Sequence, residues 1–229
     1  VALGAAAREA LRLADELKTM LAGLRAALEK DDRRRVAETG TLDDVMDVVS
    51  ASIGTYLSAL DPAAMTEADH RRAGEIMAFV TGLESAGDVV ERNLLALAAK
   101  RIKRGLGGPR ETTADLLDAI DRLLANLHAA AALFVCEDVR AARRLAAEKL
   151  VFRGIEAKAA AERFGLLRAG GMAAAETTAL HLDILRDLKR VNAHLIEASA
   201  YPVLESKGEL LSSRLIRVDE PPELARDAA

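Results

Sequence analysis

Tryptophan is absent from this 229-residue chain, and aromatic residues make up only 3% of it. β-Sandwiches and β-barrels depend on aromatic and β-branched side chains, so an all-β fold is disfavoured. Glycine and proline are also scarce, at 15 and 5 residues, which is few for a turn-rich chain. Hydrophobic residues nevertheless reach 51%, which argues against disorder, and the abundant alanine, leucine, arginine and glutamate are strong helix formers. The composition predicts an all-α protein.

Further absences narrow the class of protein. Cys136 is the only cysteine, so an internal disulfide is excluded and a reducing compartment fits. The longest uninterrupted apolar run, 129–136, is far shorter than the roughly 18 to 20 residues that span a bilayer. Acidic residues outnumber basic ones by 36 to 32, so the basic footprint of a nucleic-acid-binding protein is missing. Because the chain begins at Val1 without a signal-peptide pattern, we expect a fragment of a longer protein.

The few prolines and glycines predict where helices end. Pro62 and Pro202 end helical segments, because proline inside a helix costs about 3 kcal/mol. The stretch 105–109 is the clearest break, and Thr66 and the acidic pair at 31–32 suit helix starts. Apolar residues recur at helical spacing between these marks. Six long helices joined by short loops follow, roughly 4–30, 32–60, 66–104, 111–136, 138–169 and 173–200, and short loops imply antiparallel neighbours.

The six helices fall into two similar halves. The third and sixth helices share the pattern acid, three residues, Asp, four residues, Asn, at an offset of 99 residues. The matched pairs are Glu84 with Asp183, Asp88 with Asp187, and Asn93 with Asn192. This repeat predicts two three-helix bundles, 1–108 and 109–205, followed by a tail, 206–229.

The repeated acids form the candidate functional site. Glu84 and Asp88 lie one helical turn apart and interrupt an otherwise apolar face, and Asp183 and Asp187 do the same in the sixth helix. Carboxylates on an inward face need cations, either a metal ion held by converging helices or neighbouring arginine and lysine side chains. Both alternatives stay open on the residues alone. The remaining candidates are Asp43 and Asp47 on the second helix, Arg190 and His194 beside Asp187, and the pair Asn93 and Asn192. Each asparagine lies five residues after the second acid of its motif, about 140° around the helix from it, and so suits an interhelical hydrogen bond.

Nothing in the sequence supports catalysis. We find no P-loop, no nucleophile motif and no dinucleotide-binding glycine pattern. A ferritin-like di-iron enzyme needs Glu-x-x-His on two helices, and only the pair Glu67 and His70 has that spacing. We therefore expect a protein that is not an enzyme.

At this point the residues resemble a known family. The chain resembles PhoU proteins, which also have two halves of three helices with an acid-x-x-x-Asp motif on the third helix of each half. The segment 83–93 (LESAGDVVERN) resembles the motif of that family, with Ala86 where isoleucine is usual. Segments 180–195 (LHLDILRDLKRVNAHL), 200–210 (AYPVLESKGEL) and 212–215 (SSRL) resemble the PhoU-like C-terminal domain of bacterial sodium/phosphate cotransporters. The opening 8–15 and the segment 93–106 do so too.

The resemblance implies a function and a site. It implies a regulatory domain on the cytoplasmic face of the cell membrane, tuning sodium-dependent phosphate uptake through contact with a transmembrane transporter domain that precedes Val1 in the same chain. The alternative is a free-standing PhoU-type phosphate-signalling regulator that acts on a transporter or a sensor kinase. A homodimer is compatible with either. Fe, Zn, Mn or Mg ions are the implied cofactors, and Phe152, which stands where a second acid is expected after Glu148, argues against equal clusters in both halves. The implied metal ligands are Glu84, Asp88, Asp183, Asp187, Asp43 and Asp47.

Overall fold

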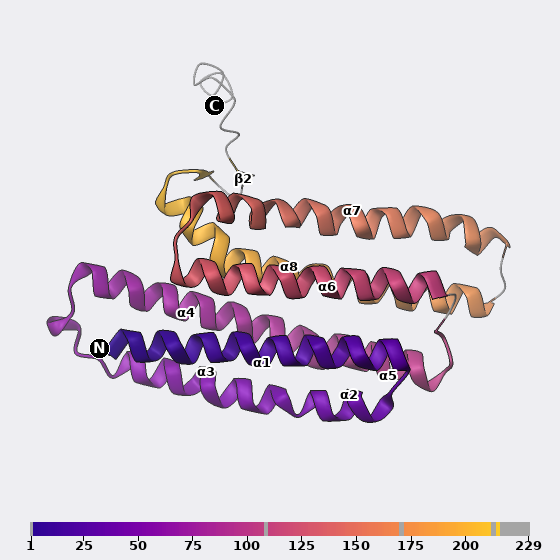
Figure 1. Ribbon diagram of the computed structural model, residues 1–229, viewed down its shortest axis with the longest axis horizontal. Helices are drawn as coiled ribbons and strands as arrows, with labels where there is room; N and C mark the ends of the chain where they lie inside the picture. The colour runs from indigo at the N-terminus through magenta and orange to yellow at the C-terminus, as the bar shows by residue number, and fades with distance from the viewer. Residues whose placement is uncertain (1, 108–109, 170–171, 212–213, 216–229) are drawn as a thin grey trace, which may run out of the picture.

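The computed structural model describes residues 2–107, 110–169, 172–211 and 214–215, and these are almost entirely helical (Figure 1). The helical order is α1 (Ala2–Lys30), α2 (Arg33–Gly40), α3 (Leu42–Ser58), the 3₁₀ turn η1 (Pro62–Ala64), α4 (Glu67–Asp88), the π-helical η2 (Val89–Leu95), α5 (Ala96–Lys103), α6 (Arg110–Val135), α7 (Val139–Ala169) and α8 (Met172–Ser206). Two short antiparallel strands, β1 (Leu210–Leu211) and β2 (Arg214–Leu215), follow α8. The all-α prediction is confirmed.

Three of the six predicted helices differ in detail from the observed ones. The predicted helix 32–60 is broken at Thr41 into α2 and α3, and the predicted helix 66–104 contains the π-helical segment η2. The last helix does not end at Pro202 but continues to Ser206. Val203 and Leu204 are buried beyond the proline, so we attribute the continuation to their packing, which outweighs the cost of one lost backbone hydrogen bond.

Several helix starts follow the local rules of capping. The Thr66 hydroxyl accepts from the backbone N–H of Asp69, and the Asp69 carboxylate accepts from the backbone N–H of Thr66. Asp32 caps α2 through the backbone N–H groups of Arg34 and Arg35. The expected starts at Thr66 and at 31–32 are confirmed. The expected domain boundary at 108–109 and the tail beyond residue 215 lie outside the described residues.

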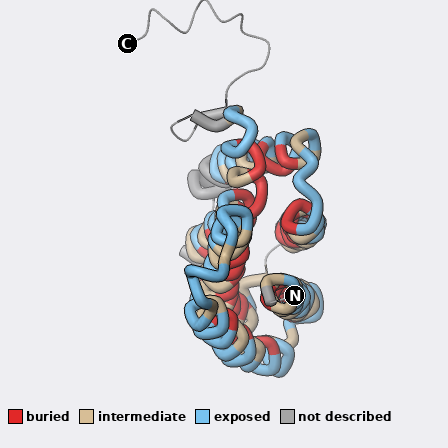
Figure 2. The backbone as a smooth tube through the Cα atoms, turned by 90° about the vertical axis from the view of Figure 1, so that its left-hand side faces the viewer, coloured by how far each residue is buried: buried red, intermediate tan, exposed pale blue. Residues whose placement is uncertain are grey.

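The helices form two layers. One layer is a row of four helices in the order α3, α4, α8 and α7. The other layer consists of α1 and α6, which lie side by side on one side of this row. In the end-on view of Figure 2, the buried residues face one another inside the molecule. Helices α3 and α7 are the two edges of the row, at the bottom and the top of Figure 1. The two expected halves, α1 to α5 and α6 to α8, are packed together along α1–α6 and α4–α8.

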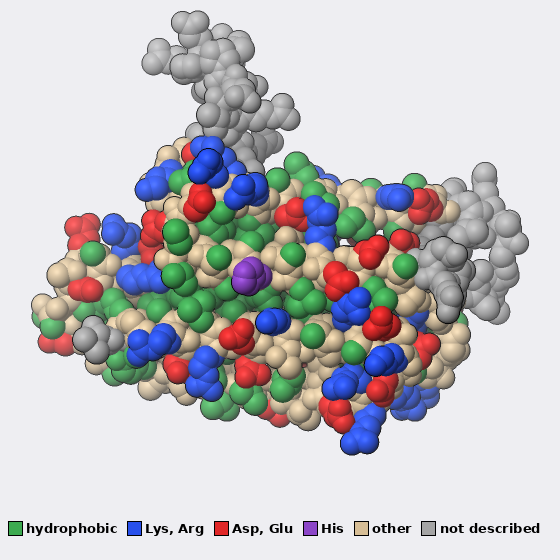
Figure 3. Space-filling view, in the orientation of Figure 1, with side chains coloured by type: hydrophobic (Ala, Val, Ile, Leu, Met, Phe, Trp, Pro, Cys, Tyr) green, Lys and Arg blue, Asp and Glu red, His purple; other side chains and the backbone are tan. Residues whose placement is uncertain are grey.

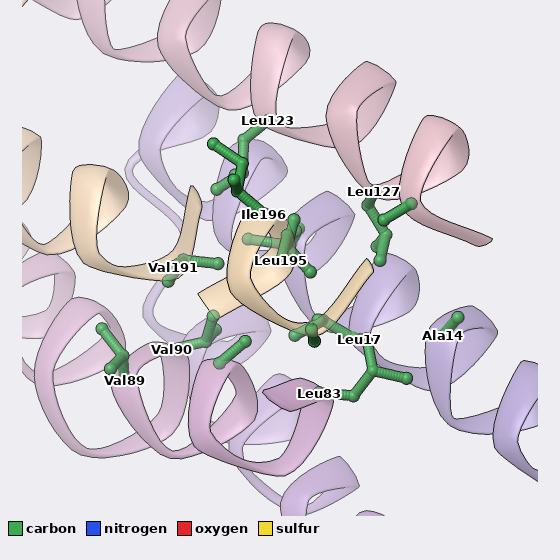
Figure 4. Close-up of a cluster of buried hydrophobic side chains, with 14 of the residues drawn as sticks. Ala14, Leu17, Leu83, Val89, Val90, Leu123, Leu127, Val191, Leu195 and Ile196 are labelled. Carbon is green, nitrogen blue, oxygen red and sulfur yellow. The ribbon is translucent and has the colours of Figure 1, made fainter. Parts of the chain in front are cut away.

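One core joins the two halves. Leu17 of α1, Leu83 of α4, Leu123 of α6 and Ile196 of α8 are fully buried in the same cluster (Figure 4). On the outer side of α1 and α6, hydrophobic side chains gather along the line where the halves meet (Figure 3). The burial of these apolar side chains is the main force holding the halves together.

Close backbone approach fixes how α4 crosses α8. A Cβ atom added at Gly82 would lie 2.3 Å from the Cβ of Ala198, so only glycine fits this position as the helices are placed. This crossing lies two residues before Glu84 and six residues before Asp88. It therefore sets the distance between the two helices that carry the repeated acids.

A buried arginine ties the end of the first half to the start of the second. Arg101 of α5 is 3% exposed and donates to the carbonyl oxygens of Leu28 (3.2 Å) and Gly107 (3.0 Å). It also donates to the Asp31 carboxylate (3.2 Å) and to the Thr113 hydroxyl (2.6 Å). One side chain thus links the α1 end, the chain leaving α5 and the first turns of α6.

Candidate functional site

The first-half acids gather where α3 packs against α4. Asp43 is 9% exposed, and its Oδ1 would lie 3.3 Å from a Cβ at Gly87, so the missing side chain of that glycine gives the carboxylate its space. Asp47, one turn along α3, and Asp88 and Glu91 are its charged neighbours. We refer to Asp43, Asp47, Asp88 and Glu91 as the α3–α4 acidic cluster.

The electrostatics of this cluster disfavour a charged Asp43. Burial, and after it the negative charges of Asp47, Glu91 and Asp88, raises the pKa of Asp43 from 3.8 to about 6. Arg92 opposes this effect and forms an ion pair with Asp88 (2.9 Å). The cluster therefore holds one proton more readily than four separate carboxylates would.

Glu84 lies beside this cluster but has a partner of its own. Its Oε2 accepts a 2.7 Å hydrogen bond from the hydroxyl of Ser50, which is 8% exposed on α3. The bond joins α3 to α4. Sequence reasoning placed Glu84 and Asp88 on one face, and the structure gives them different contacts, Ser50 and Arg92 respectively.

The second-half acids follow a different pattern. The Asp187 side chain is 1% exposed, and its Oδ1 accepts from Arg190 at 3.0 Å, with Arg186 at 3.8 Å. Its Oδ2 accepts from the amide of Asn93 in η2, at 3.3 Å. Asp183 is 40% exposed and pairs with Arg186 at 2.9 Å. Salt bridges, one of the two alternatives that the sequence left open, thus pair both repeated acids of α8.

The second asparagine joins a separate polar chain. Asn126 of α6 donates to Asn192 (2.9 Å) and to Glu148 of α7 (3.2 Å). Glu148 also accepts two hydrogen bonds from Arg122 (2.5 and 2.7 Å), which hold the pKa of its carboxyl below the ordinary value. Both predicted asparagines thus make interhelical hydrogen bonds. The chain from Arg122 to Asn192 ties all three helices of the second half together.

The π-helical segment explains why Asn93 faces the second half. In a π-helix the backbone hydrogen bonds connect residues five apart, so the face presented after Asp88 differs from that of a continuing α-helix. Asn192 occupies the matching sequence position in α8, which stays α-helical there. The repeat in the sequence is therefore not a repeat in geometry at these two residues.

His194 is half-buried in α8, close to the α4 crossing. Its carbonyl oxygen would lie 3.3 Å from a Cβ at Gly82. Burial lowers the pKa of its imidazole, and the positive charge of Arg190 acts in the same direction, whereas Glu197 raises it. The ring is thus neutral at pH values at which an ordinary histidine is still largely protonated.

The candidate metal ligands do not converge as a group. Among the residues that the structure describes, no three His, Cys, Asp or Glu side chains are placed to hold a metal ion. The α3–α4 acidic cluster has the oxygen donors that hard cations prefer, whereas Asp187 already has arginine partners. Metal binding stays a prediction, and the residues fit it better in the first half than in the second.

Sequence reasoning missed several residues of these networks, among them Glu91, Ser50 and Asn126. Glu91 continues the stripe of Glu84 and Asp88 at the next helical turn, so its spacing could have identified it. Ser50 and Asn126 gave no such signal. Their roles depend on which side chain of a neighbouring helix lies opposite, and that is decided by tertiary packing.

The comparisons with known proteins show that the chain is similar to part of proteins that are named for phosphate export. It is 33% identical over 205 residues to a protein of Salmonella typhimurium, and 34% identical over 214 residues to a protein of Escherichia coli K12. Both carry a provisional name, inorganic phosphate export protein YjbB. The alignments cover 90–91% of this chain but only 37–38% of the relatives' length. No family model matches the chain, and no solved structure does.

These findings correct two expectations drawn from the family resemblance. A role in tuning phosphate uptake is wrong, because the relatives are named for export of phosphate. The expected partner, a transmembrane transporter domain of the same chain, is also withdrawn. The ground is that the relatives align with about nine-tenths of this chain. As a separate finding, none of the helices in the described part has the length and apolarity to cross a bilayer.

Proposed function

We propose that this chain is a helical regulator of cellular phosphate that acts on phosphate export through contacts with other proteins and not as an enzyme. The observation that carries the proposal is its identity of 33–34%, over about nine-tenths of its length, to relatives named for phosphate export. Its partner is the exporter or a sensor kinase that controls export, on the cytoplasmic side of the membrane.

A PhoU-type organisation is part of this proposal. Two observations support it: the two helical halves that pack along α1–α6 and α4–α8, and the acid motif on the third helix of each half. The halves differ in charge. Asp187 has two arginine partners, whereas the four acids of the α3–α4 acidic cluster share one arginine, Arg92, which pairs with Asp88 and Glu91. We therefore propose that the first half carries the regulatory site.

A phosphate-efflux assay tests the function. Cells that lack the chain are loaded with radioactive phosphate, and efflux is followed with and without the wild-type chain supplied from a plasmid. We expect the chain to change the initial efflux rate. The Asp43→Asn, Asp88→Asn double variant should lose this effect, whereas Asp44→Asn, which removes an exposed neighbouring charge, should keep it. Equal efflux with and without the wild-type chain would contradict the proposal.

Elemental analysis tests whether the regulatory site uses a metal ion. The purified wild-type chain is compared with the same Asp43→Asn, Asp88→Asn variant and with the control variant Asp183→Asn. The control removes a carboxylate that pairs with Arg186 at 2.9 Å in the wild type. Stoichiometric Fe, Zn, Mn or Mg that is lost only in the first variant would make the regulation metal-linked. Equal, substoichiometric metal in all three proteins would remove metal from the proposal.

A further inference from the structure

The exposed large hydrophobic side chains concentrate on the two edges of the four-helix row. Of the five such residues in the described part of the chain, Val45, Val48 and Tyr56 lie on α3 and Leu150 lies on α7. Val48 and Leu150 are each 67% exposed. The outer face of a surface helix is normally polar, so these side chains mark faces that are suited to contact.

On α7 five exposed apolar positions form one continuous stripe. Exposed residues follow one another at alternating steps of three and four, which places them on a single seam. They are Ala147, Leu150, Gly154, Ala157 and Ala161. Apart from Leu150 these side chains are small, so the backbone of another helix can approach closely. Leu150 then projects from a flat surface.

The charges around the two faces are opposite in sign. α7 carries eight basic and three acidic side chains, and two of the acids, Glu148 and Glu156, are bound to Arg122 and Lys189 of neighbouring helices. Arg140, Arg144 and Arg153 are exposed and form no ion pair with any described residue.

α3 has the opposite charge. It carries three aspartates and no basic residue. Asp44 and Asp47 are exposed, and neither forms an ion pair within the described ranges. Val48 follows Asp44 by one helical turn and lies on the same side of α3, so this face combines apolar surface with negative charge, as α7 combines apolar surface with positive charge.

A depression beside α3 is suited to a projecting leucine. It lies between α1 and α3, has a volume of about 360 Å³, and is lined mainly by apolar atoms. Ala6, Val49, Ile53 and Tyr56 contribute to its walls. It opens next to Ser52, in the middle of the exposed α3 face.

From these features we infer that the α7 face of one copy of this chain packs on the α3 face of a second copy, with Leu150 in the depression between α1 and α3. Within one molecule this contact is impossible, because α3 and α7 are the opposite edges of the row (Figure 1). Two-fold symmetric pairing through one of these faces alone is disfavoured, because it would oppose two basic α7 faces or two acidic α3 faces. The inference does not depend on the proposed function.

The contact is head-to-tail, and this predicts how assembly depends on concentration. Each added copy leaves one free α3 face and one free α7 face, so association continues beyond a dimer unless the rotation closes a ring. Salt should weaken it, since exposed charges are screened within about 10 Å at 0.1 M ionic strength.

Analytical ultracentrifugation of the purified chain tests the inference with charge-reversed variants. The acidic-α7 variant is Arg144→Glu, Arg153→Glu, and the basic-α3 variant is Asp44→Arg, Asp47→Arg. Each variant alone presents two faces of like charge, so we expect its association constant to fall at least about tenfold below that of the wild type. An equimolar mixture should associate again, because each face then meets its opposite. Circular dichroism verifies that each variant folds.

Two controls complete the test. Lys18→Glu, Lys103→Glu changes the net charge as much as the acidic-α7 variant does, at exposed positions outside both faces, and should associate like the wild type. Leu150→Ser removes the projecting side chain without a charge change and should weaken association. A wild-type chain that is monomeric at all concentrations in low salt, or a mixture that does not associate, would overturn the inference.

Discussion

The amide of Asn93 donates a hydrogen bond to the carboxylate of Asp187 across the boundary between the two halves of the molecule, at 3.3 Å. Asn93 belongs to the π-helical segment η2 and Asp187 to the middle of α8. The Asp187 side chain is 1% exposed, so water cannot replace the asparagine as a donor without a change in packing. The acid motif of the second half is thus completed by a residue of the first.

We expect Asn93→Leu to lower the free energy of unfolding by about 1–3 kcal/mol, because a buried carboxylate loses a donor. Urea denaturation measures the change. The matched control is Asp183→Asn, which affects a 40% exposed carboxylate on the same helix as Asp187 and should cost less than about 1 kcal/mol. Equal costs for the two variants would mean that the bond between the halves contributes no stability.

The α4–α8 crossing predicts opposite effects for two glycine-to-alanine changes on one helix. Gly82→Ala places a Cβ 2.3 Å from the Cβ of Ala198 and should destabilise the fold by about 1–3 kcal/mol through overpacking. Gly74→Ala meets nothing within 4 Å and should stabilise it by about 0.5–1 kcal/mol, because alanine is the better helix former. Thermal unfolding of both variants measures the difference. Adding Ala198→Gly to Gly82→Ala should recover part of the loss, and no recovery would place the strain elsewhere.

The raised pKa of Asp43 predicts a stability that falls as pH rises. Its pKa is about 6 in the folded protein against 3.8 as the reference, so the folded state holds more protons between these values. The stabilising contribution is complete below about pH 4 and is lost as pH rises through 6. Asp43→Asn should therefore gain about 1–3 kcal/mol relative to the wild type between pH 4 and pH 8.

Urea denaturation of both proteins at several pH values tests this dependence. The lowered pKa of His194 acts in the opposite direction, because the unfolded state then binds the proton more readily and stability falls as pH drops. It is present in both proteins, so the difference between them isolates Asp43. Asp44→Asn, at an exposed position, serves as control. If the free energies of unfolding of the wild type and of Asp43→Asn changed with pH in the same way, the raised pKa of Asp43 would be refuted.

Arg101 predicts a stability effect that lysine cannot rescue. Its guanidinium reaches four acceptors, and burial lowers its pKa, while Asp31 opposes that effect. Arg101→Ala should cost about 3 kcal/mol, since the buried carbonyl of Leu28 and three further acceptors lose their donor at once. Arg101→Lys should recover little, because an ammonium group lacks the planar fork. Chemical denaturation compares both variants with Lys103→Ala, an exposed change in the same helix, and a full rescue by lysine would reduce the role of Arg101 to its charge.

Much of the fold followed from local rules that act within a few residues. Helix propensity, apolar spacing and side-chain caps such as Thr66 are properties of neighbouring residues, so the long helices and several of their starts could be predicted. Pro202 shows the limit of these rules. It predicts a helix end locally, yet α8 continues because Val203 and Leu204 are buried beyond it.

The candidate site also shows which features follow from local rules and which depend on tertiary packing. Asp183 and Asp187 are equivalent in the sequence, one helical turn apart and each near arginines, and the sequence determined that both are acids on one stripe of α8. Only the tertiary structure decided that Asp187 is buried against Asn93 while Asp183 remains 40% exposed. The physical reason is that a helix fixes the angle between its own side chains, whereas burial depends on which neighbouring helix lies opposite each angle. That arrangement is set here by the π-helical segment and by the close crossing at Gly82.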